Sequence, residues 1–378
     1  MAYQSVDQLQ RTLTTSVFHY AKDSKKAAGR ALGTLVEIIT YYLLRTWQLG
    51  PHVAIERGLA EYGNPAITHN VEYSLHPICV HSPLKMAKAK LPLTSGKILS
   101  AMAESGRGWT NKNQQLLTTS GLVRNSCVIG ESKRGSLVAT EVDESEETYR
   151  ISLAEQRPAP FAMFECKRVG IEEGMKKGPQ TIEKAKQGAY VARSVSSLHK
   201  IRAQDGRLLG VMSKADGTLE SKPHDKFLSE IIASHSVEWL RDFILSVGVV
   251  SNHGNWFTAE NHNKEIMVLA QSYDWLLFLT DAGLAQFIED VLLTPRPELA
   301  PARKAFLASY PKANGENRFT KVRMDLHAHH ALLDYFTREA ATIESWFNII
   351  APAAGNLGLL RRQLKILAQK DWDKIHAV

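Results

Sequence analysis

Apolar residues repeat at steps of three and four along residues 31–49, which predicts a long helix with one buried face. This apolar stripe consists of Leu32, Leu35, Val36, Ile39, Leu43 and Leu44. A second helix is expected over 179–202, because Pro179 suits a first helical turn and small apolar residues follow it at helical spacing. Beyond Arg323 the pattern is helical to the end of the chain.

Shorter apolar runs predict strands between these helices. Residues 161–167 have the pattern of a buried strand, and 148–153 that of the strand before it, so a turn at 154–160 would join them in a hairpin. The predicted fold class is α/β. A mixed central β-sheet of about five strands is flanked by helices, with a largely helical C-terminal elaboration. The proline-punctuated segment 294–311 suggests a core at 1–300 and a helical C-terminal extension at 301–378.

Composition narrows the class of protein. The chain has 378 residues, and 46 Lys and Arg against 39 Asp and Glu give a net charge of +7, which permits a polyanionic partner. Cys79, Cys127 and Cys166 form no C-x-x-C pair, so neither a disulfide framework nor a zinc site is indicated and a cytoplasmic location is expected. No apolar run reaches the roughly 18 residues of a membrane span, so no membrane partner is expected.

The candidate chemistry lies at the end of the 161–167 strand. Side chains alternate along a strand, so Glu165 and Lys167 project from one face while Cys166 projects from the other. Five carboxylates lie just upstream, within 141–147, and the predicted hairpin brings Glu147 opposite Glu165. Carboxylates bind a hard cation such as Mg²⁺, and a lysine stabilises charge that develops on a phosphate. These are the components of a metal-dependent phosphodiester hydrolase.

This arrangement resembles the PD-(D/E)xK nuclease superfamily, whose signature is an acid that starts one strand and E-x-K that ends the next. The resemblance assigns Glu165 to the (D/E) position and Lys167 to the K position, and it leaves the first acid open among Glu147, Glu146 and Asp143. Glu37, in the 31–49 helix, resembles the glutamate that approaches the metal site from the opening helix of many restriction endonucleases.

The implied activity is that of a Mg²⁺-dependent type II restriction endonuclease acting on double-stranded DNA. Its catalytic residues would be Glu165, Lys167, Glu147 and Glu37. Its metal ligands would be Glu165, Glu147 or Asp143, and the carbonyl oxygen of Cys166 at the strand end. A palindromic target would favour a two-fold homodimer, with residues 323–378 supplying extra contacts.

Two sets of polar residues are candidate DNA contacts. A glycine-flanked loop at 106–115 carries side chains of the types that read base edges in the major groove, namely Arg107, Asn111, Lys112 and Asn113. Cations downstream of the strand suit the phosphate backbone, namely Lys176, Lys177, Lys186 and Arg193.

Other polar residues are assigned structural roles, among them Glu72, Tyr73 and His76. The cluster Asp325, His327, His329 and His330 lies on a predicted helix, where positions two apart do not share a face, so no metal site is expected there. Two alternatives to a restriction enzyme stay open. One is a non-catalytic protein that binds nucleic acid through a basic helix face, and the other is a phosphodiesterase that uses the histidine cluster.

Overall fold

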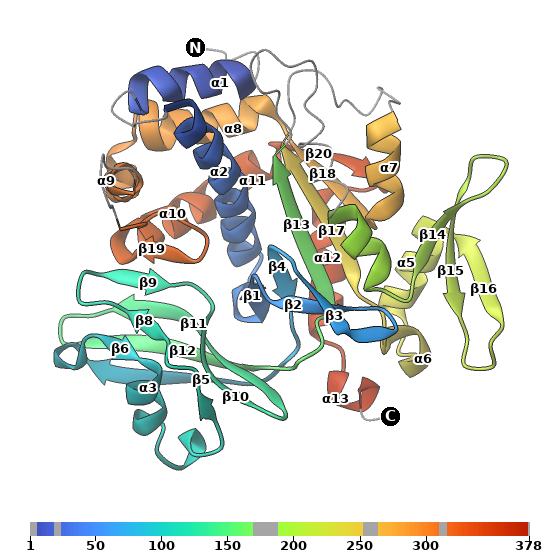
Figure 1. The fold of residues 1–378 in the computed structure, drawn as a ribbon, viewed down its shortest axis with the longest axis horizontal. Helices are drawn as coiled ribbons and strands as arrows, with labels where there is room; N and C mark the ends of the chain where they lie inside the picture. The colour runs from blue at the N-terminus through green and yellow to red at the C-terminus, as the bar shows by residue number, and fades with distance from the viewer. Residues whose placement is uncertain (1–5, 19–23, 169–187, 252–263, 310–315, 377–378) are drawn as a thin grey trace.

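A mixed six-stranded sheet forms the centre of the molecule (Figure 1). The computed structural model describes residues 6–18, 24–168, 188–251, 264–309 and 316–376. The strands of the sheet, in spatial order, are β1 (Val53–Ile55), β4 (Tyr73–Leu75), β13 (Ala162–Arg168), β17 (Leu245–Ser251), β18 (Trp275–Leu279) and β20 (Phe347–Ala351). β13, β17 and β18 are parallel, whereas β1, β4 and β20 each run antiparallel to their neighbours.

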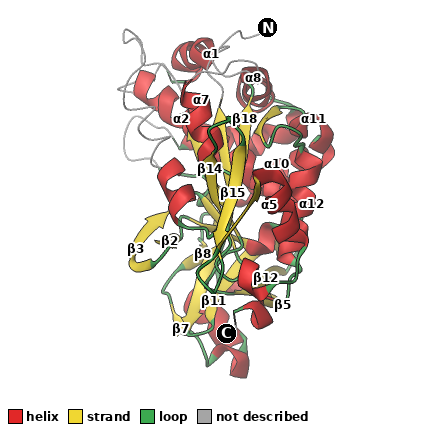
Figure 2. Ribbon diagram, turned by 90° about the vertical axis from the view of Figure 1, so that its right-hand side faces the viewer, coloured by secondary structure: helices red, strands yellow, loops and turns green. Residues whose placement is uncertain are grey.

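Helices cover both faces of this sheet. β17 and β18 are buried along their whole length, as expected for parallel strands covered on two sides. The helix α2 (Ser24–Thr46) contacts β13 and β17, and α12 (Leu357–Ala368) lies on the same face, where the indole N–H of Trp275 donates to Gln363. A helix over 188–194 and α7 (Lys264–Ser272) cover the other face. Figure 2 shows α12 and α7 on opposite sides of the strands.

A β-rich insertion separates β4 from β13 in the chain and occupies the lower left of Figure 1. Its ends meet, because the Phe161 N–H donates to the Leu75 carbonyl. One antiparallel sheet, in the order β5-β12-β11-β10-β7, comprises β5 (Ile78–Ala87), β12 (Thr148–Gln156), β11 (Gly135–Glu144), β10 (Cys127–Ser132) and β7 (Thr110–Asn111). A second sheet comprises β19 (Arg323–Asp325), β9 (Leu122–Arg124), β8 (Gln115–Leu117) and β6 (Leu93–Thr94). The short helices of the insertion are η3 (Lys88–Lys90), α3 (Ser95–Ala101) and η4 (Ala103–Gly106).

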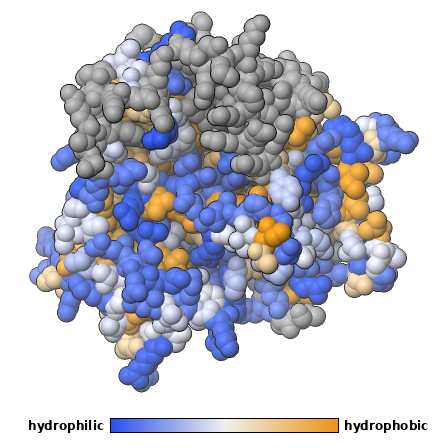
Figure 3. Space-filling model, viewed as in Figure 1, coloured by the Kyte–Doolittle hydropathy of each residue, from blue (hydrophilic) through white to orange (hydrophobic). Residues whose placement is uncertain are grey.

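Two further β elements project from the body. One is the hairpin of β2 (Gly58–Glu61) and β3 (Asn64–Asn70), which comes directly before β4 in the chain. The other is a sheet of β14 (His199–Arg202), β15 (Leu208–Ser213) and β16 (Leu219–Pro223). Ile201 and Leu219 are exposed on this sheet, and apolar surface gathers there in Figure 3.

The remaining helices surround the sheets. Before β1 lie α1 (Val6–Thr12), η1 (Leu13–Val17) and η2 (Gly50–His52). Between β16 and β18 lie α5 (His224–Ala233) and α6 (Val237–Leu240) in addition to α7. After β18 come α8 (Asp281–Ile288), η6 (Glu289–Leu293), η7 (Pro297–Leu299), α9 (Ala300–Ala308), α10 (Leu326–Arg338), α11 (Ala340–Glu344) and α13 (Trp372–Ile375). None of the helices in the described parts of the chain is long and apolar enough to cross a membrane.

The α/β class and the mixed sheet are confirmed, and so is the long N-terminal helix. The predicted hairpin of 148–153 with 161–167 is wrong, because β12 pairs with β5 and β11 while β13 pairs with β4 and β17. The 179–202 helix is too long as predicted, since the helical residues that the structure describes end at 194 and residues 199–202 form β14. The C-terminal part is not helical throughout, because β20 adds a strand to the main sheet.

Candidate active site

Glu165 and Lys167 lie on the same face of β13, as the alternation of a strand requires. The Lys167 ammonium lies 3.0 Å from Glu165 Oε1, and the Glu165 carboxylate is buried. Gly188, the first described residue of the 188–194 helical segment, lies directly against this carboxylate. A Cβ at Gly188 would come within 2.6 Å of both Glu165 Cγ and the Tyr273 hydroxyl oxygen. Glycine is therefore required there for the helix to pack this close to Glu165.

A second acid, Glu72, lies beside Glu165. β4 runs antiparallel to β13 with Tyr73 paired to Phe164, so Glu72, the residue before β4, lies next to Glu165. The backbone N–H of Glu72 donates to Glu165 Oε2 at 3.1 Å. An acid at the start of β4 thus lies next to the E-x-K of β13. This position of Glu72 was not predicted from the sequence, because the insertion places 92 residues between the two acids.

Glu37 joins these residues from α2. The Tyr73 hydroxyl donates to the Glu37 carbonyl at 2.7 Å, which ties the middle of the helix to the start of β4. The ammonium of Lys321 then connects three carboxylates. It lies 3.4 Å from Glu37 Oε2 and 3.0 Å from Glu56 Oε1, and it also bonds Glu72 Oε2. We refer to Glu37, Glu56, Glu72, Glu165, Lys167 and Lys321 as the acid cluster.

Burial and neighbouring charges shift the pKa values of Glu37, Glu165 and Lys321. Burial, assisted by the charge of Glu72, raises the pKa of Glu37 to about 7. Burial also raises the pKa of Glu165, although the Lys167 ammonium opposes the shift. Burial alone would lower the pKa of Lys321, but the charges of Glu37 and Glu72 outweigh it and raise that pKa.

The donor set of the acid cluster fits a hard divalent cation, because it consists of carboxylate oxygens. Within the described residues, no three Asp, Glu, His or Cys side chains stand in a grouping ready to hold a metal ion. The Lys321 ammonium lies among Glu37, Glu56 and Glu72. The Cys166 side chain is buried on the other face of β13, and its carbonyl oxygen remains a predicted ligand.

No protein-family model, curated protein or solved structure matches this chain.

The acids that the sequence analysis placed beside Glu165 lie elsewhere. Asp143 is exposed on β11, where it pairs with Arg150 of β12. Glu146 and Glu147 are exposed in the turn between these two strands. β12 is a neighbour of β5 and β11 and not of β13, so the 141–147 run belongs to the inserted sheet. The pairing of Glu147 or Asp143 with Glu165 is therefore wrong.

The predicted base-reading residues lie together on the inserted sheet. Arg107 follows η4, Asn111 ends β7, and Lys112 and Asn113 come directly after it, all four exposed. Lys112 pairs with Glu131 of β10 at 2.8 Å. Among the predicted phosphate contacts, Arg193 is exposed on the 188–194 helix, five residues after Gly188. Lys176, Lys177 and Lys186 lie outside the described residues.

The histidine cluster has structural partners. Asp325 caps α10 by accepting hydrogen bonds from the N–H groups of His327 and Ala328. His329 is buried and bonds the Tyr42 hydroxyl at 2.9 Å, while the His330 ring bonds the Val142 carbonyl. The exposed His327 ring lies 3.8 Å from the Asp325 carboxylate.

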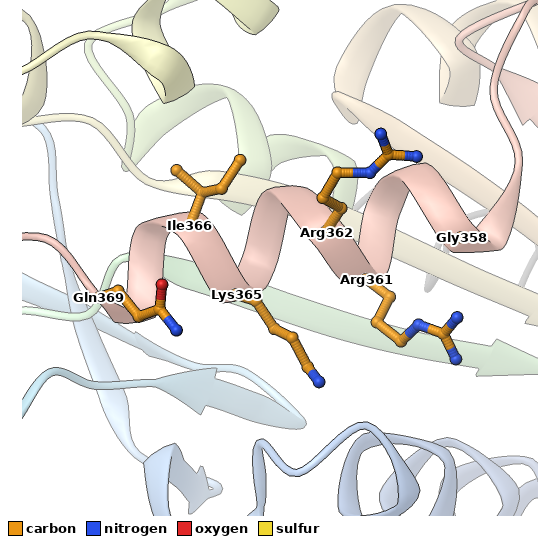
Figure 4. A pocket seen from close by; sticks show the side chains of 6 residues that line it. All are labelled: Gly358, Arg361, Arg362, Lys365, Ile366 and Gln369. Atoms are coloured by element: carbon orange, nitrogen blue, oxygen red, sulfur yellow. The ribbon is translucent and has the colours of Figure 1, made fainter.

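A separate basic hollow lies along α12 (Figure 4). It is open, about 450 Å³ in volume, and lined by Gly358, Arg361, Arg362, Lys365, Ile366 and Gln369. Arg361 is paired with Glu344, and Lys365 reaches Gln48. The hollow lies on the face of the sheet opposite to that from which Glu165 projects.

Proposed function

We propose that this chain is a Mg²⁺-dependent nuclease that hydrolyses phosphodiester bonds of double-stranded DNA. Its active site would comprise Glu72, Glu165, Lys167 and Glu37. One observation carries the proposal, namely the antiparallel pairing of β4 with β13 that sets Glu72 beside Glu165. An acid that starts one strand beside E-x-K on the next is the signature of the PD-(D/E)xK superfamily, and here Glu72 replaces the acids first considered.

Each residue has a role that follows from its position. Glu72 and Glu165 would hold the divalent cation together, because the Glu72 backbone N–H donates to the Glu165 carboxylate and so sets the two acids side by side on neighbouring strands. When bound, Mg²⁺ would activate water and neutralise charge on the phosphate. Glu37, on α2, is linked to Glu72 through the Lys321 ammonium, and its pKa near 7 suits a group that exchanges a proton near neutral pH.

Lys167 is placed to act on the reacting phosphate. It is the more exposed member of its pair with Glu165, so its ammonium faces the side from which a substrate would arrive. The Lys167 ammonium, held in place by Glu165, would stabilise the negative charge that develops on the phosphate in the transition state. Lys167 should therefore affect turnover more than binding.

The finer parts of the proposal concern specificity and assembly. We place base reading on Arg107, Asn111, Lys112 and Asn113, which are exposed on a sheet inserted between the two strands of the site. Arg193 would contact the phosphate backbone. A type II restriction enzyme with a palindromic target would act as a homodimer. The three cysteines are unpaired, as expected of a cytoplasmic enzyme.

Incubation of the purified protein with plasmid DNA and Mg²⁺ tests the proposal, with EDTA as the control. Discrete fragments that require Mg²⁺ are expected from the wild type, and none from Glu72→Ala. Binding of the plasmid without cleavage in Mg²⁺ would instead support a non-catalytic nucleic-acid-binding protein.

A further inference from the structure

Lys321 is held differently from an ordinary surface lysine. Its side chain is only 7% exposed, and its ammonium contacts Glu37, Glu56 and Glu72 at once. These three residues come from α2, from the segment after β1 and from the segment before β4. Lys321 is thus the group that joins three separate parts of the acid cluster.

The charges of the acid cluster do not balance when all of its carboxylates are ionised. Four carboxylates, those of Glu37, Glu56, Glu72 and Glu165, face the two ammonium groups of Lys167 and Lys321. The cluster then carries two excess negative charges, which one divalent cation would neutralise. An ammonium and a divalent ion held by the same oxygens would lie only a few ångströms apart and would repel each other strongly.

The backbone that carries Lys321 is fixed in place. Phe319 and Met324 are fully buried and bridge each other across the turn. The Asn125 amide group donates to the Lys321 carbonyl, and the Asn125 backbone N–H donates to the Val322 carbonyl. The side chain of Lys321, with its four rotatable bonds, is therefore the part that can leave the carboxylates while the turn stays where it is.

We propose that the Lys321 ammonium occupies the position of a divalent cation in the acid cluster, so that lysine and metal compete for Glu37, Glu56 and Glu72. The inference rests on the proposed function, because it concerns the metal that the nuclease would use. Metal binding requires that the Lys321 side chain rotates away from these carboxylates. The free protein should consequently bind metal weakly.

Lys321→Met tests the competition without any nucleic acid. We expect its affinity for Ca²⁺, measured by isothermal titration calorimetry, to exceed that of the wild type by about tenfold or more, because the competing charge is gone. Ca²⁺ should also raise the melting temperature of Lys321→Met by more than it raises that of the wild type. Equal Ca²⁺ affinities in the two proteins would overturn the proposal.

Lys200→Met provides a matched control. Lys200 is a half-buried lysine whose ammonium donates to the backbone carbonyls of Ala270 and Tyr273. Removing it should destabilise the protein in a way that Ca²⁺ does not repair. A gain in Ca²⁺ affinity as large in Lys200→Met as in Lys321→Met would also contradict the proposal.

Lys321→Met can fail to fold in metal-free buffer, and that outcome is informative. In that case the yield of folded protein is measured after refolding with and without Ca²⁺. A yield that depends on Ca²⁺ supports the competition, and equal yields contradict it. The nuclease assay is independent of these measurements. Tighter Ca²⁺ binding by Lys321→Met together with no cleavage by the wild type would refute the nuclease and leave the competition standing.

Discussion

Two groups of carboxylates in this molecule differ in what surrounds them. The run at 141–147 lies on the rim of the inserted sheet, where Asp143, Glu146 and Glu147 are exposed. The acid cluster contains fewer acids, drawn from four distant segments, and shares them with Lys167 and Lys321. Water solvates Asp143, Glu146 and Glu147 in the first group, whereas the buried carboxylates of the second depend on its two lysines. A high density of acids along the sequence therefore does not imply that their carboxylates converge in space.

The largest contrast between the two groups is expected in catalysis. Glu72→Ala, Glu165→Ala and Lys167→Ala should each slow single-turnover cleavage by about 10³-fold or more, because each removes a group that holds metal or stabilises the transition state. Glu147→Ala and Asp143→Ala should cleave at rates near that of the wild type. The measurement is single-turnover cleavage of plasmid DNA at saturating Mg²⁺. Loss of activity in Glu147→Ala with full activity in Glu72→Ala would reverse the assignment.

Removing a lysine from each group should affect stability unequally. Lys321→Met leaves buried carboxylates without their partner and should lower the free energy of unfolding by about 3–5 kcal/mol in metal-free buffer. Lys88→Met removes the partner of Glu144 at the surface, where the pair contributes about 1 kcal/mol or less. Urea unfolding at pH 7 measures both. Similar losses in the two variants would show that the acid cluster is no more dependent on its lysine than the surface run.

Gly188→Ala should disturb the acid cluster through packing. The added methyl group would clash with Glu165 and Tyr273, so the free energy of unfolding should fall by about 1–3 kcal/mol. Cleavage should slow as well, because Glu165 has to move. Gly33→Ala, on α2 at a site where a Cβ meets nothing within 4 Å, is the control and should leave the cleavage rate unchanged. A Gly188→Ala protein with normal stability and rate would show that the helix does not set the position of Glu165.

The ionisation of Glu37 should make the free energy of unfolding depend on pH. Its pKa is raised from the ordinary 4.5 to about 7 in the folded state, mainly by burial. The folded protein therefore holds this proton more tightly than the unfolded chain. The resulting stabilisation is complete below about pH 4.5 and is lost as the pH rises through 7. In the wild type this loss in the free energy of unfolding should be on the order of 2 kcal/mol, and Glu37→Gln should not show it. Urea unfolding at pH 4.5, 5.5 and 7 measures it, and parallel curves for the two proteins would contradict the assignment.

The smallest effects should come from exposed residues far from buried charge. Arg193→Ala should weaken binding to all DNA sequences alike. It should also reduce the slope of log affinity against log salt concentration by about one. Asn111→Ala should instead alter the preference between sequences. Binding titrations at several salt concentrations, with Ca²⁺ in place of Mg²⁺, separate the two cases. If Asn111→Ala leaves discrimination unchanged, base reading takes place elsewhere.

The sequence was sufficient to predict features that depend on neighbouring residues. The periodicity of 31–49 predicted α2, and the alternation of 161–167 predicted the same-face pair of Glu165 and Lys167. The partner of β13 was not predictable in this way. The local rule that successive strands pair led to Glu147, but the strand that pairs with β13 ends at Leu75, before an insertion of some 85 residues. A carboxylate directly before a short alternating strand, as in Val71-Glu72-Tyr73, was the available signal.

The position of Lys321 in the acid cluster could not be predicted from the sequence, for a different reason. Its turn docks on Asn125, which lies almost 200 residues earlier in the chain, and no periodicity links the two segments. The early end of the 179–202 helix has a similar cause. Residues 199–202 pair with β15, so tertiary pairing overrides a local pattern that suits a helix.

The insertion between β4 and β13 also has a consequence for the order in which the protein folds. Glu37, Glu72, Glu165 and Lys321 belong to segments that are far apart in the chain, so no fragment synthesised early contains the whole acid cluster. Contacts of such long range form slowly, because the intervening chain has to be ordered before its ends can meet. A partly folded chain would hold these carboxylates apart and would have no place for a metal ion. The appearance of cation binding during refolding should therefore mark the completion of the native structure.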